Sequence, residues 1–426
     1  MPAATMIEDV YRAEWARLVA ALTRRFGDLD IAEEAAGEAF VAAVEHWRDG
    51  QPPNPGGWLM TTATRRALDR VRRDSRRHEK YAAALLIGAA RTTEDATVDS
   101  TQDEAMEAIH AEAGGIEDDR LRLIFTCCHP ALAPEAQVAM TLRLVGGLTV
   151  EQIARGLLKS EAAVGQRITR AKAKVADARI PYRVPSDDDL PERVSAVLSV
   201  LYLVFNEGYL PGGDTPLRPD LTTEAIRLTR LLHELLPADN ESTGLLALML
   251  LTDARRASRV SADGELVPLA EQDRSGWDRQ MIDEGHALVR GLIAGGDPPG
   301  RYQLEAAINA VHTYARDIRD TDWAQLGTLY DRLYAVHPSP VIALNRAIVV
   351  AELDGPAVAL AEVDRLGLSA YHAWHVTRAE LLRRLGRSRQ ARRAYDAAIA
   401  LATNAAEIRH LRRRRASLVD QPPAGG

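Results

Sequence analysis

Cysteines, long apolar runs and strand-like patterns are all scarce in this chain of 426 residues. Its two cysteines, Cys127 and Cys128, are neighbours and cannot link distant segments, which argues against a secreted disulfide scaffold. The longest apolar runs, such as residues 245–251, fall far short of the roughly 20 residues that span a bilayer. The chain also lacks a basic segment followed by an apolar stretch at its start. We therefore expect a cytoplasmic protein that has no membrane partner.

Motifs of catalysis and metal binding are missing too. The sequence has no phosphate-cradling glycine loop and no helical pattern of metal ligands, and its 11 histidines lie scattered without a partnered nucleophile. The run CCHP at residues 127–130 could suggest a metal or thiol sensor. Contiguous ligands suit tetrahedral geometry poorly, so two core cysteines are the favoured interpretation. We expect no enzymatic activity, no metal and no cofactor.

Apolar residues at helical spacing, by contrast, occur in almost every window longer than about ten residues. The hydrophobic fraction of 46% and the charged fraction of 27% are those of a packed globular protein. The fold class predicted is therefore all-α, with one small hairpin at residues 259–269. A single core stops growing at about 250 to 300 residues, so we expect several domains.

Clusters of proline, glycine and acidic residues mark the boundaries between these domains. In the first domain the apolar spacing predicts helices over residues 7–26, 30–47 and 57–77. The expected parts are a helical domain at 1–80, an acidic flexible linker at 81–115, a helix-turn-helix domain at 116–178, a linker at 179–191 and a helical extension at 192–420.

Part of the extension, residues 322–405, has the spacing of tetratricopeptide-like repeats. Gly355 and Gly386 are 31 residues apart, each at the place of a turn between two helices, and small residues follow Gly386 at positions that let helices pack closely. An irregular helical bundle with accidental matches is the alternative.

The strongest local signal is LTVEQIARGLLKSEAAVGQRITRAKAKV at residues 148–175. Thr149 with Gln152 predicts a capping box, and Ser160 can cap the next helix. Ala154 and Val164 are ten residues apart, as in a helix-turn-helix, where a small residue lets two helices cross closely and a buried aliphatic anchors the second. A helical hairpin with a solvated basic face is the alternative. The residues that we expect to reach base edges and phosphates are Ser160, Glu161, Ala162, Gln166, Arg167, Arg170 and Lys174.

A second basic segment lies earlier, where residues 65–80 carry eight basic and three acidic side chains although the whole chain has a net charge of −7. Guanidinium groups on a helix suit a DNA backbone, and a preceding Trp in a Gly-Pro loop, which we expect to be exposed, suits stacking on an unpaired base. A solvated helix face is the alternative for the charge run alone. The candidate DNA contacts are Trp58, Arg65, Arg66, Arg70, Arg72 and Arg73.

Residues 7–178 resemble bacterial sigma factors of the extracytoplasmic-function (ECF) type. The second helix of that family reads D-x-A-E-D/E-x-x-Q-E-x-F, and this chain matches it except for Gly37 in place of the usual Gln. The matching positions are Asp30, Ala32, Glu33, Glu34, Glu38 and Phe40. The next helix of the family matches at Trp58, Leu59, Ala63, Leu68, Asp69, Arg72 and Arg73. Thr64 and Arg65 depart from the Arg-Asn pair of the family.

The resemblance implies a subunit of RNA polymerase that selects promoters for transcription initiation. Residues 1–80 would be sigma region 2, which melts the minus-ten element, and residues 116–178 would be region 4, which reads the minus-thirty-five element on the β flap. A face of the second helix would dock on the β′ clamp helices. Its polymerase-binding residues would be Asp30, Glu33, Glu34, Glu38 and Phe40.

The extension resembles that of a subset of these sigma factors, in which a long helical C-terminal segment regulates the sigma domains in cis. The similar strings are FNEGY at 205–209, LMLLTDARRASR at 248–259, QDRSGWDR at 272–279 and YQLEAAINAVH at 302–312. Their polar groups lie beside apolar stretches and could line a pocket, or form a purely structural ion-pair network. The candidate pocket residues are Asn206, Glu207, Tyr209, Asp253, Arg255 and Arg256. A free-standing helix-turn-helix repressor with a repeat-type interaction domain is the alternative function for the whole chain.

Overall fold

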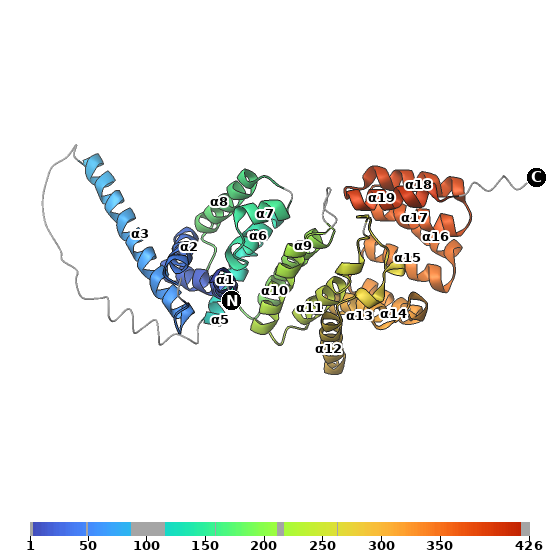
Figure 1. Cartoon of the computed structure of the whole chain (residues 1–426), viewed down its shortest axis with the longest axis horizontal. Helices are drawn as coiled ribbons and strands as arrows, with labels where there is room; N and C mark the ends of the chain where they lie inside the picture. The colour runs from blue at the N-terminus through green and yellow to red at the C-terminus, as the bar shows by residue number, and fades with distance from the viewer. Residues whose placement is uncertain are drawn as a thin grey trace, which may run out of the picture. The chain divides into compact units, whose positions relative to one another are not determined.

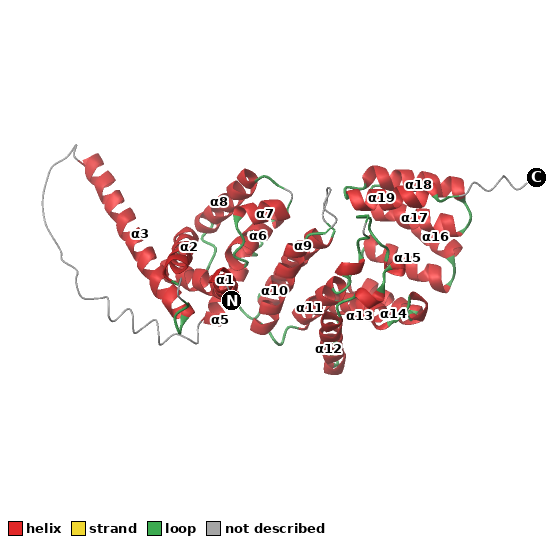
Figure 2. Ribbon diagram, in the orientation of Figure 1, coloured by secondary structure: helices red, strands yellow, loops and turns green. Residues whose placement is uncertain are grey.

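The computed structural model describes residues 3–47, 50–86, 116–157, 159–210, 217–261 and 263–418. In these ranges the chain is helical and contains no β-strand, which confirms the all-α prediction (Figures 1 and 2). An isolated antiparallel bridge joins Val260 to Leu266, where the small hairpin was predicted. None of the described helices combines the length and the apolarity that crossing a membrane requires.

The chain divides into two compact units. The first comprises Met1–Arg155 and Lys159–Val200, and the second comprises Gly156–Leu158 and Leu201–Gly426. The division falls inside helix α9 (Leu190–Tyr209), so the first half of this helix packs with the preceding domains, although the extension is predicted to start at residue 192.

Among the helices that precede α9, the first three and the last two match the predicted helices in order and type. The helices described before α9 are α1 (Ala3–Phe26), α2 (Leu29–His46), α3 (Pro55–Leu86), α5 (Ile116–Cys127), α6 (Pro134–Met140), the π-helix η1 (Thr141–Val145), α7 (Val150–Gly156) and α8 (Glu161–Asp177). Helix α3 continues to Leu86, six residues into the predicted linker, which was therefore assigned too early. The rest of that linker lies outside the described residues.

Helix α2 is the centre of the first domain because one of its faces is almost entirely alanine. Ala32, Ala36, Ala39 and Ala43 are buried, and such small side chains let α1 and α3 approach closely. The Asp28 side chain accepts hydrogen bonds from the backbone N–H groups of residues 30 and 31 and so caps the helix. The carboxylates of α2 lie on its remaining surface.

The second unit is built around a helix that is buried on all sides. In α11 (Asn240–Asp253), every residue from Ser242 onward is buried, and the helix contacts α10 (Pro219–Leu235), α12 (Arg279–Gly295) and α13 (Arg301–Tyr314). A helix that is hydrophobic all round is typical of the core of a large domain. The apolar run at residues 245–251 is thus the core of the extension.

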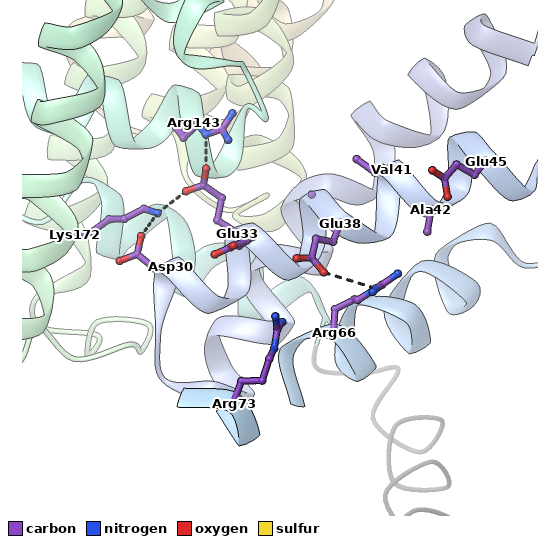
Figure 3. A pocket seen from close by; sticks show the side chains of 12 residues that line it. Asp30, Glu33, Glu38, Val41, Ala42, Glu45, Arg66, Arg73, Arg143 and Lys172 are labelled. Carbon is purple, nitrogen blue, oxygen red and sulfur yellow. Dashed lines mark hydrogen bonds and ion pairs between the residues drawn. The ribbon is translucent and has the colours of Figure 1, made fainter. Parts of the chain in front are cut away.

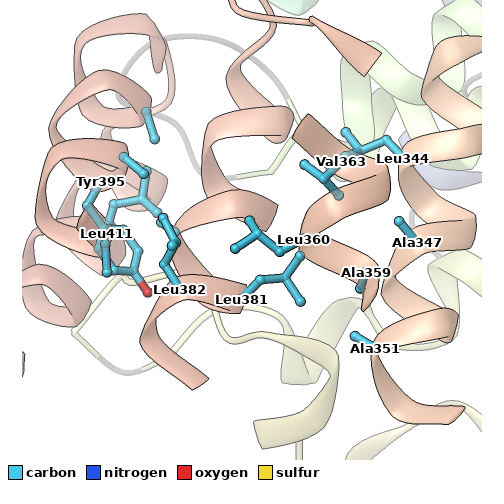
Figure 4. Packing of buried hydrophobic residues seen from close by; sticks show 14 of the residues in the cluster. Leu344, Ala347, Ala351, Ala359, Leu360, Val363, Leu381, Leu382, Tyr395 and Leu411 are labelled. Carbon is cyan, nitrogen blue, oxygen red and sulfur yellow. The ribbon is translucent and has the colours of Figure 1, made fainter. Parts of the chain in front are cut away.

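The last six helices pack in chain order, each mainly against its neighbours. They are α14 (Trp323–Val336), α15 (Pro340–Leu353), α16 (Pro356–Leu366), α17 (His372–Arg384), α18 (Ser388–Leu401) and α19 (Ala405–Ala416). Gly355 and Gly386 lie at turns between these helices with φ of 92° and 71°, a conformation that favours glycine. Figure 4 shows the core that α15 to α19 share, in which Leu360 and Leu381 pack between the helices and Tyr395 is fully buried. This packing agrees with the helix pairs predicted there, and their tetratricopeptide character stays a prediction.

Candidate functional site

The helix-turn-helix segment has the capping interactions that its sequence predicts. The backbone N–H of Thr149 donates to Gln152 Oε1 at 2.8 Å, and the N–H of Gln152 donates to Thr149 Oγ1 at 3.1 Å, a reciprocal capping box. Ser160 caps α8 by accepting from the Ala163 N–H at 3.2 Å. Ala154 and Val164 are buried, as expected of the crossing point and the anchor.

The predicted reading face of α8 lies at the surface. Glu161, Ala162, Gln166, Arg170 and Lys174 are exposed, and Arg167 is half-buried. Arg170 Nη2 donates to Gln166 Oε1 at 3.1 Å, a contact within the same face that orients both side chains. This face therefore presents amide and guanidinium groups together, the combination that reads bases and phosphates in a major groove.

The arginines of α3 whose side chains the structure describes fall into two classes. Arg66 pairs with Glu38 at 3.6 Å and Arg70 pairs with Glu34, so both are engaged by carboxylates of α2. Arg65, Arg72 and Arg73 are exposed, and no carboxylate within the described residues pairs with them. The Arg73 Nε donates to the Asp69 carbonyl at 3.3 Å. The exposed class is thus ready to meet an external anion.

Trp58 differs from its prediction as an exposed loop residue. It lies in the first turn of α3, half-buried, and its ring meets that of Trp47 edge to face at a centroid distance of 5.3 Å. The segment that precedes α3 starts the helix at Pro55, because proline fits the first helical turn, so Trp58 faces α2 and not a loop. Its ring stabilises the α2–α3 corner.

The acidic face of α2 meets two cations from the region 4 segment, which the sequence did not predict. Lys172 Nζ, on α8, lies 2.6 Å from Asp30 Oδ1 and 2.5 Å from Glu33 Oε2. Arg143 Nε, in η1, lies 2.5 Å from Glu33 Oε1. Figure 3 shows Glu33 between the two cations. We call these four residues the Glu33 clasp.

The clasp is shielded from water on the side of region 4. The Lys172 side chain is 8% exposed and that of Glu33 is 14% exposed. Burial disfavours the charge on Lys172, but the carboxylates of Glu33 and Asp30 outweigh it and raise the pKa of the ammonium group. One signal for the clasp is present in the sequence: Lys172 stands in the buried stripe that Val164, Ile168 and Ala171 form on α8.

Aromatic side chains of α1 hold η1 in place beside the clasp. The Tyr11 hydroxyl donates to the Gly147 carbonyl at 2.6 Å, and Trp15 Nε1 donates to the Arg143 carbonyl at 3.3 Å. The Arg143 guanidinium lies 5.9 Å from the centroid of the Trp15 ring and also donates to the Leu148 carbonyl at 2.8 Å. Gly147 has a φ of 75° and carries no Cβ, which would lie 2.9 Å from both rings.

A polar hollow of about 750 Å³ follows the same face of α2. Its walls include Glu34, Glu38 and Glu45 of α2, Arg66 and Arg73 of α3, and the clasp (Figure 3). Phe40, predicted as a polymerase contact, is instead 6% exposed and packs edge to face on Tyr11 at 4.8 Å. Its ring belongs to the core because its position on α2 faces α1.

In the extension the structure brings together four of the six candidate pocket residues. Asp253 is bound by Arg256, whose Nε lies 3.0 Å from Oδ1, and Arg255 reaches Tyr209 Oη at 3.5 Å. Asn206 is exposed and Glu207 is half-buried on α9. Arg274, a polar group of the QDRSGWDR string, is buried, and so is Arg259, which the sequence analysis missed and whose guanidinium lies over the Tyr209 ring.

The two cysteines are buried and free. Burial raises the pKa of the Cys128 thiol to about 11 and that of Cys127 well above its ordinary value. Since the thiolate is the nucleophile and the metal ligand, both groups are unreactive at neutral pH, as expected of core cysteines. In the described ranges no three His, Cys, Asp or Glu side chains gather as a metal site would require.

The chain is similar to known proteins over most of its length. Sigma-70 region 2 matches residues 10–77, sigma-70 region 4 matches residues 122–175, and a family of unknown function, DUF6596, matches residues 193–292. An uncharacterised protein of Rhizobium meliloti, R00370, is 44% identical over 94% of this chain and 93% of its own length. A probable ECF RNA polymerase sigma factor of Mycobacterium tuberculosis, SigI, is 28% identical over 41% of this chain and 56% of its own length.

No solved structure matches the chain. The two sigma-70 regions nevertheless coincide with the two helical domains that carry the basic helices α3 and α8. The chain therefore belongs to the sigma-70 family, as an ECF-type sigma factor that works with core RNA polymerase and promoter DNA in transcription initiation and carries a long helical C-terminal extension.

Proposed function

We propose that the acidic face of α2 docks on the β′ clamp helices of RNA polymerase, that α3 engages the minus-ten element, and that α8 reads the minus-thirty-five element while region 4 rests on the β flap. The polymerase makes the phosphodiester bonds, and this chain contributes binding energy. Its place of action is then the cytoplasm. The observation that carries the proposal is the separation of charge on the surface of the first unit: carboxylates on α2, and guanidinium groups on α3 and α8.

For the docking face we propose Asp30, Glu33, Glu34 and Glu38. Asp30 has a side chain 70% exposed, and those of Glu34 and Glu38 are 47% and 41% exposed, so they are accessible to a partner. Phe40 supports this face from within the core. Because cations of this chain already occupy the carboxylates, a basic partner surface has to replace these contacts.

The Glu33 clasp gives docking a conformational requirement. A partner that uses Glu33 competes with Lys172 and Arg143, which belong to region 4. We propose that region 2 and region 4 separate when the polymerase binds, which also frees each region for its own promoter element. Only molecules in the open form can then bind the polymerase. The apparent affinity for the polymerase is therefore the intrinsic affinity multiplied by the fraction of molecules that are open.

For promoter contacts we propose two surfaces. On α3 the exposed arginines at 65, 72 and 73 contact phosphates. Arg66 and Arg70 lie beside them on the same helix, and Trp58 lies in its first turn. On α8, Ser160, Glu161, Ala162, Gln166, Arg167, Arg170 and Lys174 face the major groove. The positions at the start of α8 enter deepest, as in other helix-turn-helix proteins.

The test is transcription with the full chain. Mixed with core polymerase, the chain should elute with it in gel filtration and produce run-off transcripts from a cognate promoter, whereas core enzyme alone should not. A promoter can be found by sequencing the transcripts that the reconstituted enzyme makes on fragmented genomic DNA. DNA binding without co-elution would favour the free-standing repressor and overturn the proposal.

We also propose that the extension regulates the sigma regions in cis. Truncation is best placed after Leu210, because the first half of α9 belongs to the first unit: Val194 and Val197 are buried, and Arg193 Nη2 donates to the Phe125 carbonyl at 2.6 Å. We expect run-off output to change about fivefold or more, the usual range of coupling between sites. Output and polymerase affinity that both stay constant would contradict regulation by the extension.

A further inference from the structure

Three arginines of the extension are more than nine-tenths buried. Arg255 follows the end of α11 and is 7% exposed, Arg259 is 8% exposed, and Arg274, in the 3₁₀ turn η4 (Arg274–Gly276), is 9% exposed. A charged side chain in a protein interior is costly unless it is paired and hydrogen-bonded. Three in one region call for a matching negative charge.

Two carboxylates near these arginines are engaged elsewhere, and a third is too far away for an ion pair. Asp253 is held by Arg256, and Asp317 is bonded by Arg319, whose Nε lies 2.9 Å from Oδ1. The third is Glu407, whose charge acts on Arg259 but which does not reach ion-pair distance. Within the described residues no carboxylate lies within ion-pair distance of the three arginines.

Their hydrogen bonds go to neutral groups. Arg259 Nη1 donates to the Tyr209 carbonyl at 2.6 Å, and its guanidinium lies 3.4 Å from the centroid of the Tyr209 ring. Arg274 Nη1 donates to the carbonyls of His312 and Ala315 at 2.7 and 2.6 Å. To the described residues Arg255 makes only long contacts, 3.5 Å to Tyr209 Oη and 3.4 Å to Asn309 Oδ1.

Several donors in the same region have no acceptor in the described part of the chain. Arg255 Nε, Arg274 Nη2 and the indole Nε1 of Trp277 are buried, and no described residue accepts a hydrogen bond from them. The Arg274 guanidinium lies 4.7 Å from the centroid of the Trp277 ring. Burial, with the charges of Arg255 and Arg274, lowers the pKa of His312 to about 4, so both cations lie near the same imidazole. Buried donors without acceptors are rare in native proteins and need an explanation.

We propose that this cluster is a binding site for a small oxyanion, a phosphate or carboxylate group, which Arg255, Arg274 and the indole N–H of Trp277 hold. Guanidinium groups suit this role because their planar forks match the oxygens of both anions. Arg259 and His312 lie beside these donors, and Arg259 adds a further positive charge. Through this site a small anion would act on the extension. This site stands independently of promoter recognition, because it needs only the second unit.

The test is thermal unfolding of the full chain in potassium phosphate, potassium citrate or potassium chloride at equal ionic strength. We expect phosphate or citrate to raise the unfolding midpoint saturably, by about 5 °C at saturation, beyond the effect of chloride. The anion that saturates at the lower concentration identifies the class of ligand. Equal midpoints in all three salts would overturn the proposal.

Two variants locate the effect. Arg255→Met keeps the length of the side chain and loses only long contacts, so it should fold in chloride and lose most of the shift. Trp277→Phe keeps a ring and removes the N–H, and the ligand concentration at half-saturation should rise about tenfold. The matched control is Arg332→Met, an exposed arginine on α14 of the same unit, which should keep the full shift. A full shift in both Arg255→Met and Trp277→Phe would contradict this site.

Discussion

Lys172→Met should tighten the binding of the full chain to core RNA polymerase about tenfold, if the acidic face of α2 docks there. The substitution removes the ammonium group that lies 2.5 Å from Glu33 and 2.6 Å from Asp30. It leaves both carboxylates on the docking face and places an apolar side chain in the buried stripe of α8. The contact between region 4 and the acidic face of α2 is weakened. Core polymerase then competes with fewer internal cations for Asp30 and Glu33.

The size of the effect follows from what remains of the clasp. Removing one partner of a buried ion pair costs about 3 to 5 kcal/mol when the other charge is left alone. Arg143 still neutralises Glu33, so we expect a smaller cost, about 1.4 kcal/mol, which is a factor of ten in the equilibrium between closed and open forms. Fluorescence anisotropy of the labelled chain, titrated with core polymerase, measures this change in affinity.

Glu33→Gln is the informative counterpart, because it breaks the Lys172–Glu33 pair from the other side, together with the Arg143–Glu33 pair. It also opens the clasp, but it removes a carboxylate that we propose the polymerase binds. Its affinity should therefore be at least about tenfold lower than that of Lys172→Met. The control is Lys174→Met, an exposed lysine two residues further along α8, which should leave the affinity unchanged. Equal affinities for Lys172→Met and Glu33→Gln would mean that the clasp is purely structural.

Arg72→Ala with Arg73→Ala should weaken promoter binding by the polymerase holoenzyme about tenfold per arginine. Both side chains are exposed and pair with no carboxylate in the described part of the chain, so they can neutralise phosphates. Each lost phosphate contact reduces the slope of log affinity against log salt by about 0.7 to 0.9. The double variant should therefore flatten the slope by roughly 1.4 to 1.8. Titrations at several salt concentrations give both quantities.

The matched control lies on the same helix. Arg66 and Arg70 already pair with Glu38 and Glu34, so their replacement by alanine removes charge that α2 partly neutralises. Arg66→Ala with Arg70→Ala should flatten the slope less than the first pair. An unchanged slope for Arg72→Ala with Arg73→Ala would show that this part of α3 faces solvent in the promoter complex.

Local features of this protein were predictable from the residues alone. The capping box of Thr149 and Gln152, the cap at Ser160 and the buried Val164 depend on side chains within one or two turns. The turns at Gly355 and Gly386 are local too, since a positive φ is a property of one residue. Helical periodicity predicted the all-α class for the same reason: each helix buries its own apolar face.

Trp58 and Phe40 show where prediction from motifs stops. Both occupy motif positions, and both were expected to face a partner. Their rings instead pack on Trp47 and Tyr11, from helices next to them in space. A large aromatic side chain is stabilised by whichever apolar surface is near, and a motif does not state which surface that is.

The sequence by itself determined the helices, their caps, their apolar faces and the charge that each carries, because these follow from interactions over a few residues. Only the tertiary structure decided which charges meet. It brought Lys172 and Arg143 to Glu33 across more than a hundred residues, and among the residues that the structure describes it gave three buried arginines of the extension no carboxylate at ion-pair distance. Ion pairs depend on distances between helices, and no local pattern along the chain encodes those distances.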